Sequence, residues 1–229
     1  MWEMIKNIVC RVLDITTDIT TPVLIDPPEN MKTLMTVKGN PILLDTVNNI
    51  ITFTSGLAID ADGGGRTYAP ENSGLIGLDY LANAGNPGNW FALVTENGTP
   101  ITQKHNDPNP GYYISTTSYQ NSNYATNDPR RYLDSEHVPY IVLPSTLFKL
   151  VSPKLLGSKV VGTNTSNGKT VIAVVGDVGP ANALGEGSIA FANALGIPSN
   201  PKNGGTDEKI IKIQVYLNVP ATGYTLQSI

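Results

Sequence analysis

The segment Val171–Gly196, which reads VIAVVGDVGPANALGEGSIAFANALG, carries the clearest structural signals in the chain. Its first five residues are apolar and predict a buried strand, and the Gly-Pro pair that follows predicts a turn. Residues 188–195 predict a short helix that ends at Gly196, because a glycine commonly closes a helix. A long final strand is expected at 209–219, where apolar and polar side chains alternate.

The rest of the chain predicts further short strands and little helix. Asn167 and Gly168 predict a hairpin turn between two apolar segments, and a second hairpin signal lies at 96–99. A short helix is expected at 78–85. Strands are expected at 41–44, 51–60, 89–95, 111–119, 140–144, 155–162 and 170–176. The 22 glycines and 17 prolines suit short strands joined by many turns, so we predict a mainly β fold with a few short helices.

The 229 residues suffice for one large domain or for one domain with an extension. Residues 1–50 contain few residues or motifs that indicate a chemical role, and we interpret them as an N-terminal extension that packs on the core. The pattern of residue types changes at residue 51, and we assign residues 51–229 to the main domain. The start of the chain lacks the apolar core and cleavage site of a signal peptide, and no apolar run reaches the length of a transmembrane helix.

The net charge, the cysteine content and the motifs of the chain argue against several classes of protein. With a formal net charge of −4 and a pI of about 5.1, the chain lacks the basic character of a nucleic-acid binder. Cys10 is the one cysteine, so neither an intrachain disulfide nor a cysteine zinc site is expected. No phosphate-loop or dinucleotide fingerprint is present, and we predict no cofactor. We expect neither nucleic acid nor membrane as a partner.

Asp177 and Glu186 are the candidate catalytic pair. Asp177 follows the buried strand, where it could line a cleft, although an aspartate there could equally bond its own turn. Glu186 lies between two glycines before the helix, where the helix dipole alone could favour an acid. Two carboxylates are what glycoside hydrolysis requires, one to protonate the leaving oxygen and one to activate water or attack the sugar. The helix start favours the ionised form of Glu186, which would suit a base.

Four further residues are candidates for binding substrate. Asp60 and Asp62 lie where a predicted strand enters a glycine-rich turn, and they could pair with a cationic ligand. Turn capping is the alternative, and a calcium loop lacks its later ligands, so we predict no metal site. Trp90 and Tyr113 could stack on sugar rings, although most aromatic side chains in a β-rich domain serve packing.

The motifs Gly-Asp, Gly-Pro, Gly-Glu-Gly-Ser-Ile-Ala and Ala-Leu-Gly-Ile in the segment that begins at Val171 resemble those of glycoside hydrolase family 75, the chitosanases. The similarity extends upstream to residues 53–63, 81–90 and 138–144, and covers roughly residues 51–219. It implies an endo-acting, inverting enzyme that cleaves the β-1,4-linked glucosamine polymer chitosan. It also implies that Asp177 and Glu186 are catalytic, with Glu186 as proton donor and Asp177 as general base, and that residues 51–229 form a catalytic domain. An enzyme of this kind is expected to be secreted or at the cell surface.

A second resemblance concerns the fold. The order strand, Asp-x-Gly-Pro, loop, small-residue helix and long strand is similar to the double-psi β-barrel of some cellulases, expansins and lytic transglycosylases. This implies a six-stranded β-barrel core. It also leaves open an enzyme that acts on peptidoglycan or a neutral glucan with Asp177 alone. A non-catalytic glycan-binding or assembly module is a third alternative.

Overall fold

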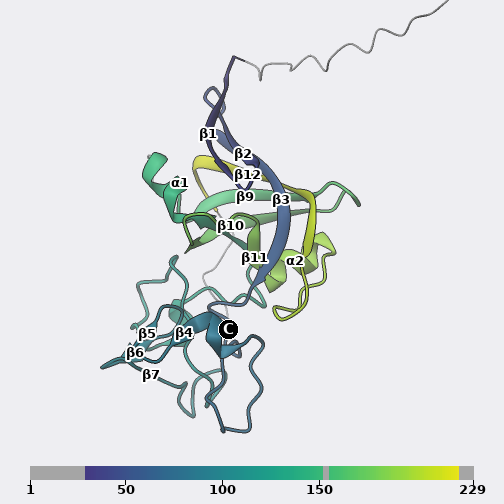
Figure 1. The fold of residues 1–229 in the computed structure, drawn as a ribbon. Helices are drawn as coiled ribbons and strands as arrows, with labels where there is room; N and C mark the ends of the chain where they lie inside the picture. Colours follow the sequence, from purple (N-terminus) through teal and green to yellow (C-terminus); the bar gives the residue numbers. More distant parts are fainter. Residues whose placement is uncertain (1–28, 152–154, 222–229) are drawn as a thin grey trace, which may run out of the picture.

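The computed structural model describes residues 29–151 and 155–221, and these form a mainly β structure around a closed six-stranded barrel (Figure 1). The barrel strands follow the spatial order β3-β11-β8-β10-β9-β12, and β12 pairs with β3 to close it. Their bounds are β3 Ile50–Asp60, β8 Tyr140–Pro144, β9 Ser158–Asn164, β10 Thr170–Gly179, β11 Glu186–Ser188 and β12 Thr206–Pro220. The predicted fold class, mainly β with a six-stranded barrel, is therefore confirmed.

The barrel interior is apolar because side chains alternate along its strands. On β12, Ile211, Ile213 and Val215 are buried and belong to the main core, while their neighbours are more exposed. Helix α2 (Ile189–Leu195) adds Phe191 to this core, and Gly196 ends the helix in a left-handed conformation, as predicted. A second helix, α1 (Ser145–Leu150), follows β8 directly.

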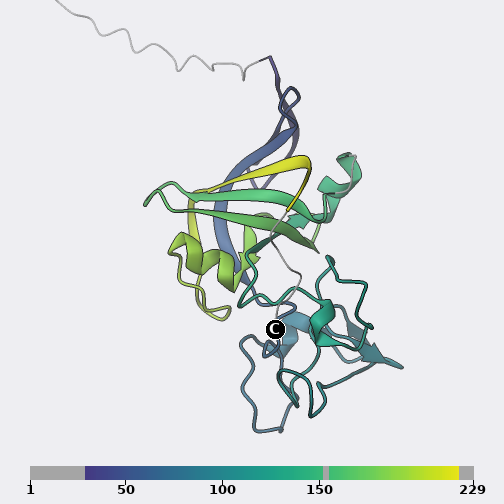
Figure 2. The ribbon, with the colours of Figure 1, turned by 180° about the vertical axis from the view of Figure 1, so that it is seen from behind.

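A hairpin of β1 (Met31–Val37) and β2 (Asn40–Asp45) extends the sheet, because β2 pairs with β3. Figures 1 and 2 show this hairpin projecting beyond the barrel. Lys38 and Gly39 form its turn, both with positive φ. The predicted strand at 41–44 lies within β2, whereas the remaining expectation for the extension, residues 1–28, lies outside the described residues.

Residues 61–139 connect β3 to β8, and we call them the insertion. They lie beside one end of the barrel (Figures 1 and 2). The elements here are short: η1 Leu81–Ala84, β4 Gly85–Asn86, β5 Asn89–Trp90, β6 Thr95–Glu96, β7 Thr99–Pro100 and η2 Pro129–Arg131. The hairpin signal at 96–99 is confirmed, since β6 pairs with β7 around Asn97 and Gly98 at positive φ.

Three expectations for the insertion are corrected. The helix expected at 78–85 is a single 3-10 turn, because the chain enters β4 at Gly85. The strand expected at 89–95 is broken after Trp90. Residues 111–119 form isolated bridges to 93 and 102 instead of a strand. Strand pairing in these segments involves only one or two residues at a time, too few to form a longer strand.

Candidate functional site

The barrel register places Asp177 and Glu186 on opposite sides of one strand. Asp177 of β10 and Glu186 of β11 both lie opposite Val142 of β8, which runs between them. Two strand spacings, or about 9–10 Å, separate the Cα atoms of residues so arranged. A bulge in the β10 register just before Asp177 brings it into line with Val142.

These side chains lie on the outer face of the barrel, beneath the insertion. Val142 packs in a cluster with Leu133 of the insertion, whereas Ile141 and Leu143 belong to the barrel interior. Because Asp177 and Glu186 are directly opposite Val142, they share its face. The pair therefore lies where the barrel and the insertion meet.

The end of β3 brings two more carboxylates to the same place. Glu186 pairs with Ala58, so Asp60, two residues further along β3, lies on the same face. Carboxylate oxygens of Asp60, Asp62 and Asp177 lie within 4.8 Å of one another. The structure thus brings together the four acidic residues that the sequence singled out, and we call Asp60, Asp62, Asp177 and Glu186 the carboxylate cluster.

Hydrogen bonds hold Asp177 by one oxygen. Its Oδ1 accepts from the backbone N–H of Ser118 at 3.0 Å, from the Ser118 hydroxyl at 2.5 Å and from the backbone N–H of Val178 at 2.7 Å. Burial raises the pKa of Asp177, and these hydrogen bonds oppose that rise because they favour the ionised form. The remaining oxygen, Oδ2, accepts none from the described residues.

Glu186 has a different environment. Its carboxylate accepts no hydrogen bond from any described residue, so nothing there offsets desolvation. Burial raises the pKa of Glu186, and the charges of Asp177 and Asp79 raise it further. Helix α2, whose start could have favoured an ionised Glu186, is only seven residues long. Its N-cap is Ser188, not Glu186.

In the carboxylate cluster, Asp60 is buried and Asp62 is half-buried. Asp60 accepts from the backbone N–H of Asp62 at 2.7 Å, and Asp62 accepts from the Tyr68 hydroxyl at 2.8 Å and the Ser115 hydroxyl at 3.4 Å. Burial raises the pKa of both aspartates well above the usual range, and the neighbouring carboxylates raise it further. Tyr140 donates to the carbonyl of Asp62 at 2.8 Å and fixes the turn.

No cation compensates the carboxylate cluster within the described part of the chain. The ion pairs there join Arg66 to Glu136, Arg130 to Asp128 and His137 to Asp134. Four carboxylates without a counter-ion must either bind protons or attract a cation. Asp60, Asp62 and Asp177 offer oxygen ligands of the kind that hard cations prefer, although acidic groups also gather without a metal.

The two aromatic candidates lie elsewhere. Trp90 and Tyr113 are half-buried and pack in the insertion around Tyr68, Ala84 and Leu93. They support Tyr68, which donates to Asp62, and none of their described contacts reaches the carboxylate cluster. Their stacking on sugar stays a prediction.

Sequence reasoning missed Ser118 and Asp79. Ser118 is 59 residues from Asp177 in the chain, and no local pattern marks it. Asp79 lies in a turn where it accepts hydrogen bonds from Asn83, which gives it the local pattern of a turn residue.

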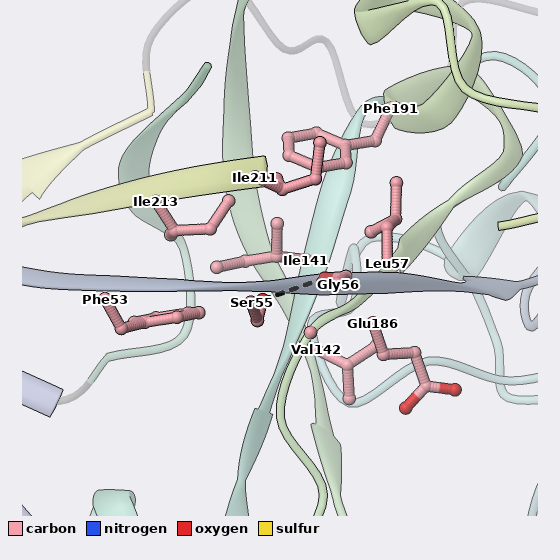
Figure 3. Close-up of a pocket in the computed structure, with 11 residues that line it drawn as sticks. Phe53, Ser55, Gly56, Leu57, Ile141, Val142, Glu186, Phe191, Ile211 and Ile213 are labelled. Carbon is pink, nitrogen blue, oxygen red and sulfur yellow. Dashed lines mark hydrogen bonds between the residues drawn. The ribbon is translucent and has the colours of Figure 1, made fainter. Parts of the chain in front are cut away.

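A small apolar pocket shares Glu186 with the carboxylate cluster but none of the three aspartates (Figure 3). Its lining includes Phe53, Ile211, Ile213 and Phe191, which are core residues of the barrel. The carboxylate of Glu186 points away from Ile211, Ile213 and Phe191 in Figure 3. We interpret the pocket as a packing gap in the barrel interior.

Comparison with known proteins adds no identification. No model of a protein family matches the chain, and a search of curated proteins finds no match. Within residues 29–151 and 155–221, no helix has the length and apolar character needed to cross a membrane.

Proposed function

We propose that this chain is an endo-acting glycoside hydrolase that cleaves a β-1,4-linked glucosamine polymer with inversion. Glu186 is the proton donor and Asp177 is the general base. The observation that carries the proposal is the placement of these two carboxylates on strands that flank Val142, on one face and in contrasting environments.

The backbone spacing of Asp177 and Glu186 allows inversion. Inverting enzymes need roughly 6.5–9.5 Å between the two carboxyl groups, whereas retaining enzymes need about 5–5.5 Å. Residues on two strands that flank a third stand about 9–10 Å apart at Cα, and this backbone spacing is compatible with a carboxyl separation in the inverting range.

The environments support the two roles. Glu186 is half-buried, receives no hydrogen bond from the described residues and faces the charge of Asp177, and these conditions favour its protonated form. Asp177 keeps three hydrogen bonds that favour its ionised form. The Glu186 proton passes to the glycosidic oxygen as the bond to the anomeric carbon breaks. Water attacks that carbon from the opposite face and gives its proton to Asp177.

The charge of the carboxylate cluster supports a cationic substrate. Glucosamine polymers carry ammonium groups, and Asp60 and Asp62 add negative charge that no described basic residue compensates. A neutral glucan would leave this repulsion in place. This is why we favour a glucosamine polymer over a neutral glycan.

The test is hydrolysis of chitosan oligomers, with reducing ends and the first-formed anomer followed by NMR. We expect Asp177→Asn and Glu186→Gln each to lower kcat by about 10³-fold or more, since each removes one acid–base partner. Asp207→Asn and Glu208→Gln are matched controls, because both residues are exposed and lie on β12, a strand that carries no member of the carboxylate cluster.

Three outcomes would contradict the proposal. No release of reducing ends by the wild type would leave a non-catalytic glycan-binding module. Full activity of Glu186→Gln, together with turnover of peptidoglycan or a neutral glucan, would favour an enzyme that uses Asp177 alone. A first product with the retained anomer would exclude inversion.

A further inference from the structure

The segment 117–119 of the insertion is fixed against β10 next to Asp177. The backbone N–H of Tyr119 donates to the carbonyl of Gly176 at 2.9 Å. The Thr117 hydroxyl donates to the carbonyl of Tyr119 at 2.9 Å and accepts from the backbone N–H of Leu133 at 3.0 Å. Ser118 therefore reaches Asp177 from backbone that is tied on both sides.

Ser118 supplies two of the three donors on Asp177, and all three converge on Oδ1. An oxygen that accepts three hydrogen bonds has little capacity left to take a proton. The hydrogen bonds also prevent rotation of the carboxylate, because an exchange of its two oxygens would break them. Oδ2 accepts no hydrogen bond from the described residues, so it is the oxygen available to a water molecule.

We propose that Ser118 is a positioning residue that saturates Oδ1 of Asp177 and leaves Oδ2 as the atom that takes the proton from water. The inference rests on the proposed function in giving Asp177 the part of general base. Ser118 itself touches neither sugar nor water in this scheme. It acts through the carboxylate that it orients.

The surroundings of Ser118 separate this role from a role in folding. Ser118 is exposed, and Asp177 is the described partner of its hydroxyl. Replacement of Ser118 by alanine removes that hydrogen bond, keeps the backbone N–H contact and disturbs no buried side chain. The same surface exposure gives room for the extra methyl group of threonine, so Ser118→Thr can restore the hydroxyl.

The charge of Asp177 supplies the chemical reason for this arrangement. Burial raises the pKa of Asp177, and the hydrogen bonds from Ser118 and Val178 oppose the rise. Without the hydroxyl, the carboxylate is less firmly ionised and is held by two backbone hydrogen bonds instead of three. Ser118 therefore tunes the protonation of the base as well as its direction.

The experiment compares wild type, Ser118→Ala, Ser118→Thr and the control Ser122→Ala on chitosan oligomers across pH. Ser122 is an exposed serine of the insertion, four residues away from Ser118. We expect Ser118→Ala to lower kcat by about tenfold with KM unchanged, the loss of one hydrogen bond to a charged group. We also expect the acidic limb of its pH profile to move to higher pH. Ser118→Thr should restore both, and an unchanged kcat and pH profile in Ser118→Ala would overturn the proposal.

A second measurement does not depend on turnover. Carbon-13 NMR of the aspartate carboxyl groups follows the titration of Asp177, with the resonance assigned by its loss in Asp177→Asn. We expect Asp177 to titrate at higher pH in Ser118→Ala than in wild type and Ser118→Thr. Unchanged titration would overturn the inference even if the enzyme cleaves chitosan. A shifted titration in a chain that cleaves no chitosan would defeat the proposed function and leave the control of Asp177 by Ser118 standing.

Discussion

Asp79 acts on the proposed acid from outside the carboxylate cluster. Its carboxylate is held by Asn83 and by the backbone N–H of Tyr80, so its direction is fixed. Its charge raises the pKa of Glu186 and also that of Asp62. A residue that touches neither reacting group therefore adds to the effects of burial and of Asp177 on the pH at which the acid loses its proton.

We predict that Asp79→Asn lowers the pKa of Glu186, because it removes a negative charge that favours the protonated form. The basic limb of the pH profile for chitosan hydrolysis should move to lower pH, while the acidic limb stays in place. Glu96→Gln is the control, since Glu96 is an exposed acid elsewhere in the insertion. A basic limb that does not move would show that Asp79 has no electrostatic role.

Among individual residues, the sequence predicted the acidic residues of the site better than the residues that contact them. Asp177 and Glu186 follow recognisable local patterns, and Asp60 and Asp62 mark the end of a strand that the structure confirms. Ser118 could not be predicted, because its contact depends on how the long insertion folds back onto β10. Trp90 and Tyr113 could not be placed, because the same insertion decides which aromatic faces are covered.

The short strand β11 depends on Ser188 for its position. The buried Ser188 hydroxyl donates to the carbonyl of Val138 at 2.8 Å and accepts from the backbone N–H groups of Tyr140 and Phe191, each at 3.1 Å. One side chain thus joins the start of β8 to the first turn of α2. Because β11 also carries Glu186, the same hydroxyl helps to place the proposed acid.

We predict that Ser188→Ala lowers the free energy of unfolding by about 2–4 kcal/mol, the cost of a lost helix cap and of buried groups left without a partner. Urea denaturation followed by circular dichroism measures the change. Ser73→Ala removes an exposed hydroxyl that bonds to the nearby backbone of Pro70 and Leu75, and it should change stability little. Equal stability of the two variants would contradict this role.

At the level of elements, regular segments were predicted and irregular ones were not. The long alternating strand β12 and the helix closed by Gly196 carry their pattern within themselves. The expected helix at 78–85 failed because tertiary pairing at Gly85 overrides a weak local preference. Gly85 also leaves no room for a side chain, since a Cβ there would lie 2.4 Å from the carbonyl oxygen of Asn89.

The carboxylate cluster makes the stability of the whole molecule depend on pH. Burial raises the pKa of all four carboxyl groups above the ordinary values of 3.8 for aspartate and 4.5 for glutamate. A carboxyl group whose pKa is raised by folding contributes fully below its unfolded pKa. That contribution is lost as pH rises through the folded pKa.

We predict that the free energy of unfolding falls as pH rises from about 4 towards neutrality. Asp60→Asn should flatten this slope and should be more stable than wild type at pH 7, because it removes a buried charge that its neighbours repel. Urea denaturation at a series of pH values measures the slope. Asp207→Asn makes the same change in net charge on an exposed residue, and an equal effect of both variants would contradict the prediction.

The connection of the insertion to the barrel affects how the protein can evolve. The insertion leaves the barrel after β3 and returns at β8, and in the barrel only β11 lies between these two strands. Its length can therefore change while the register that aligns Asp177 and Glu186 with Val142 is preserved. Changes in parts of the insertion other than Ser118 and Asp79 can then alter which polymer the proposed enzyme binds while the proposed catalytic pair keeps its place.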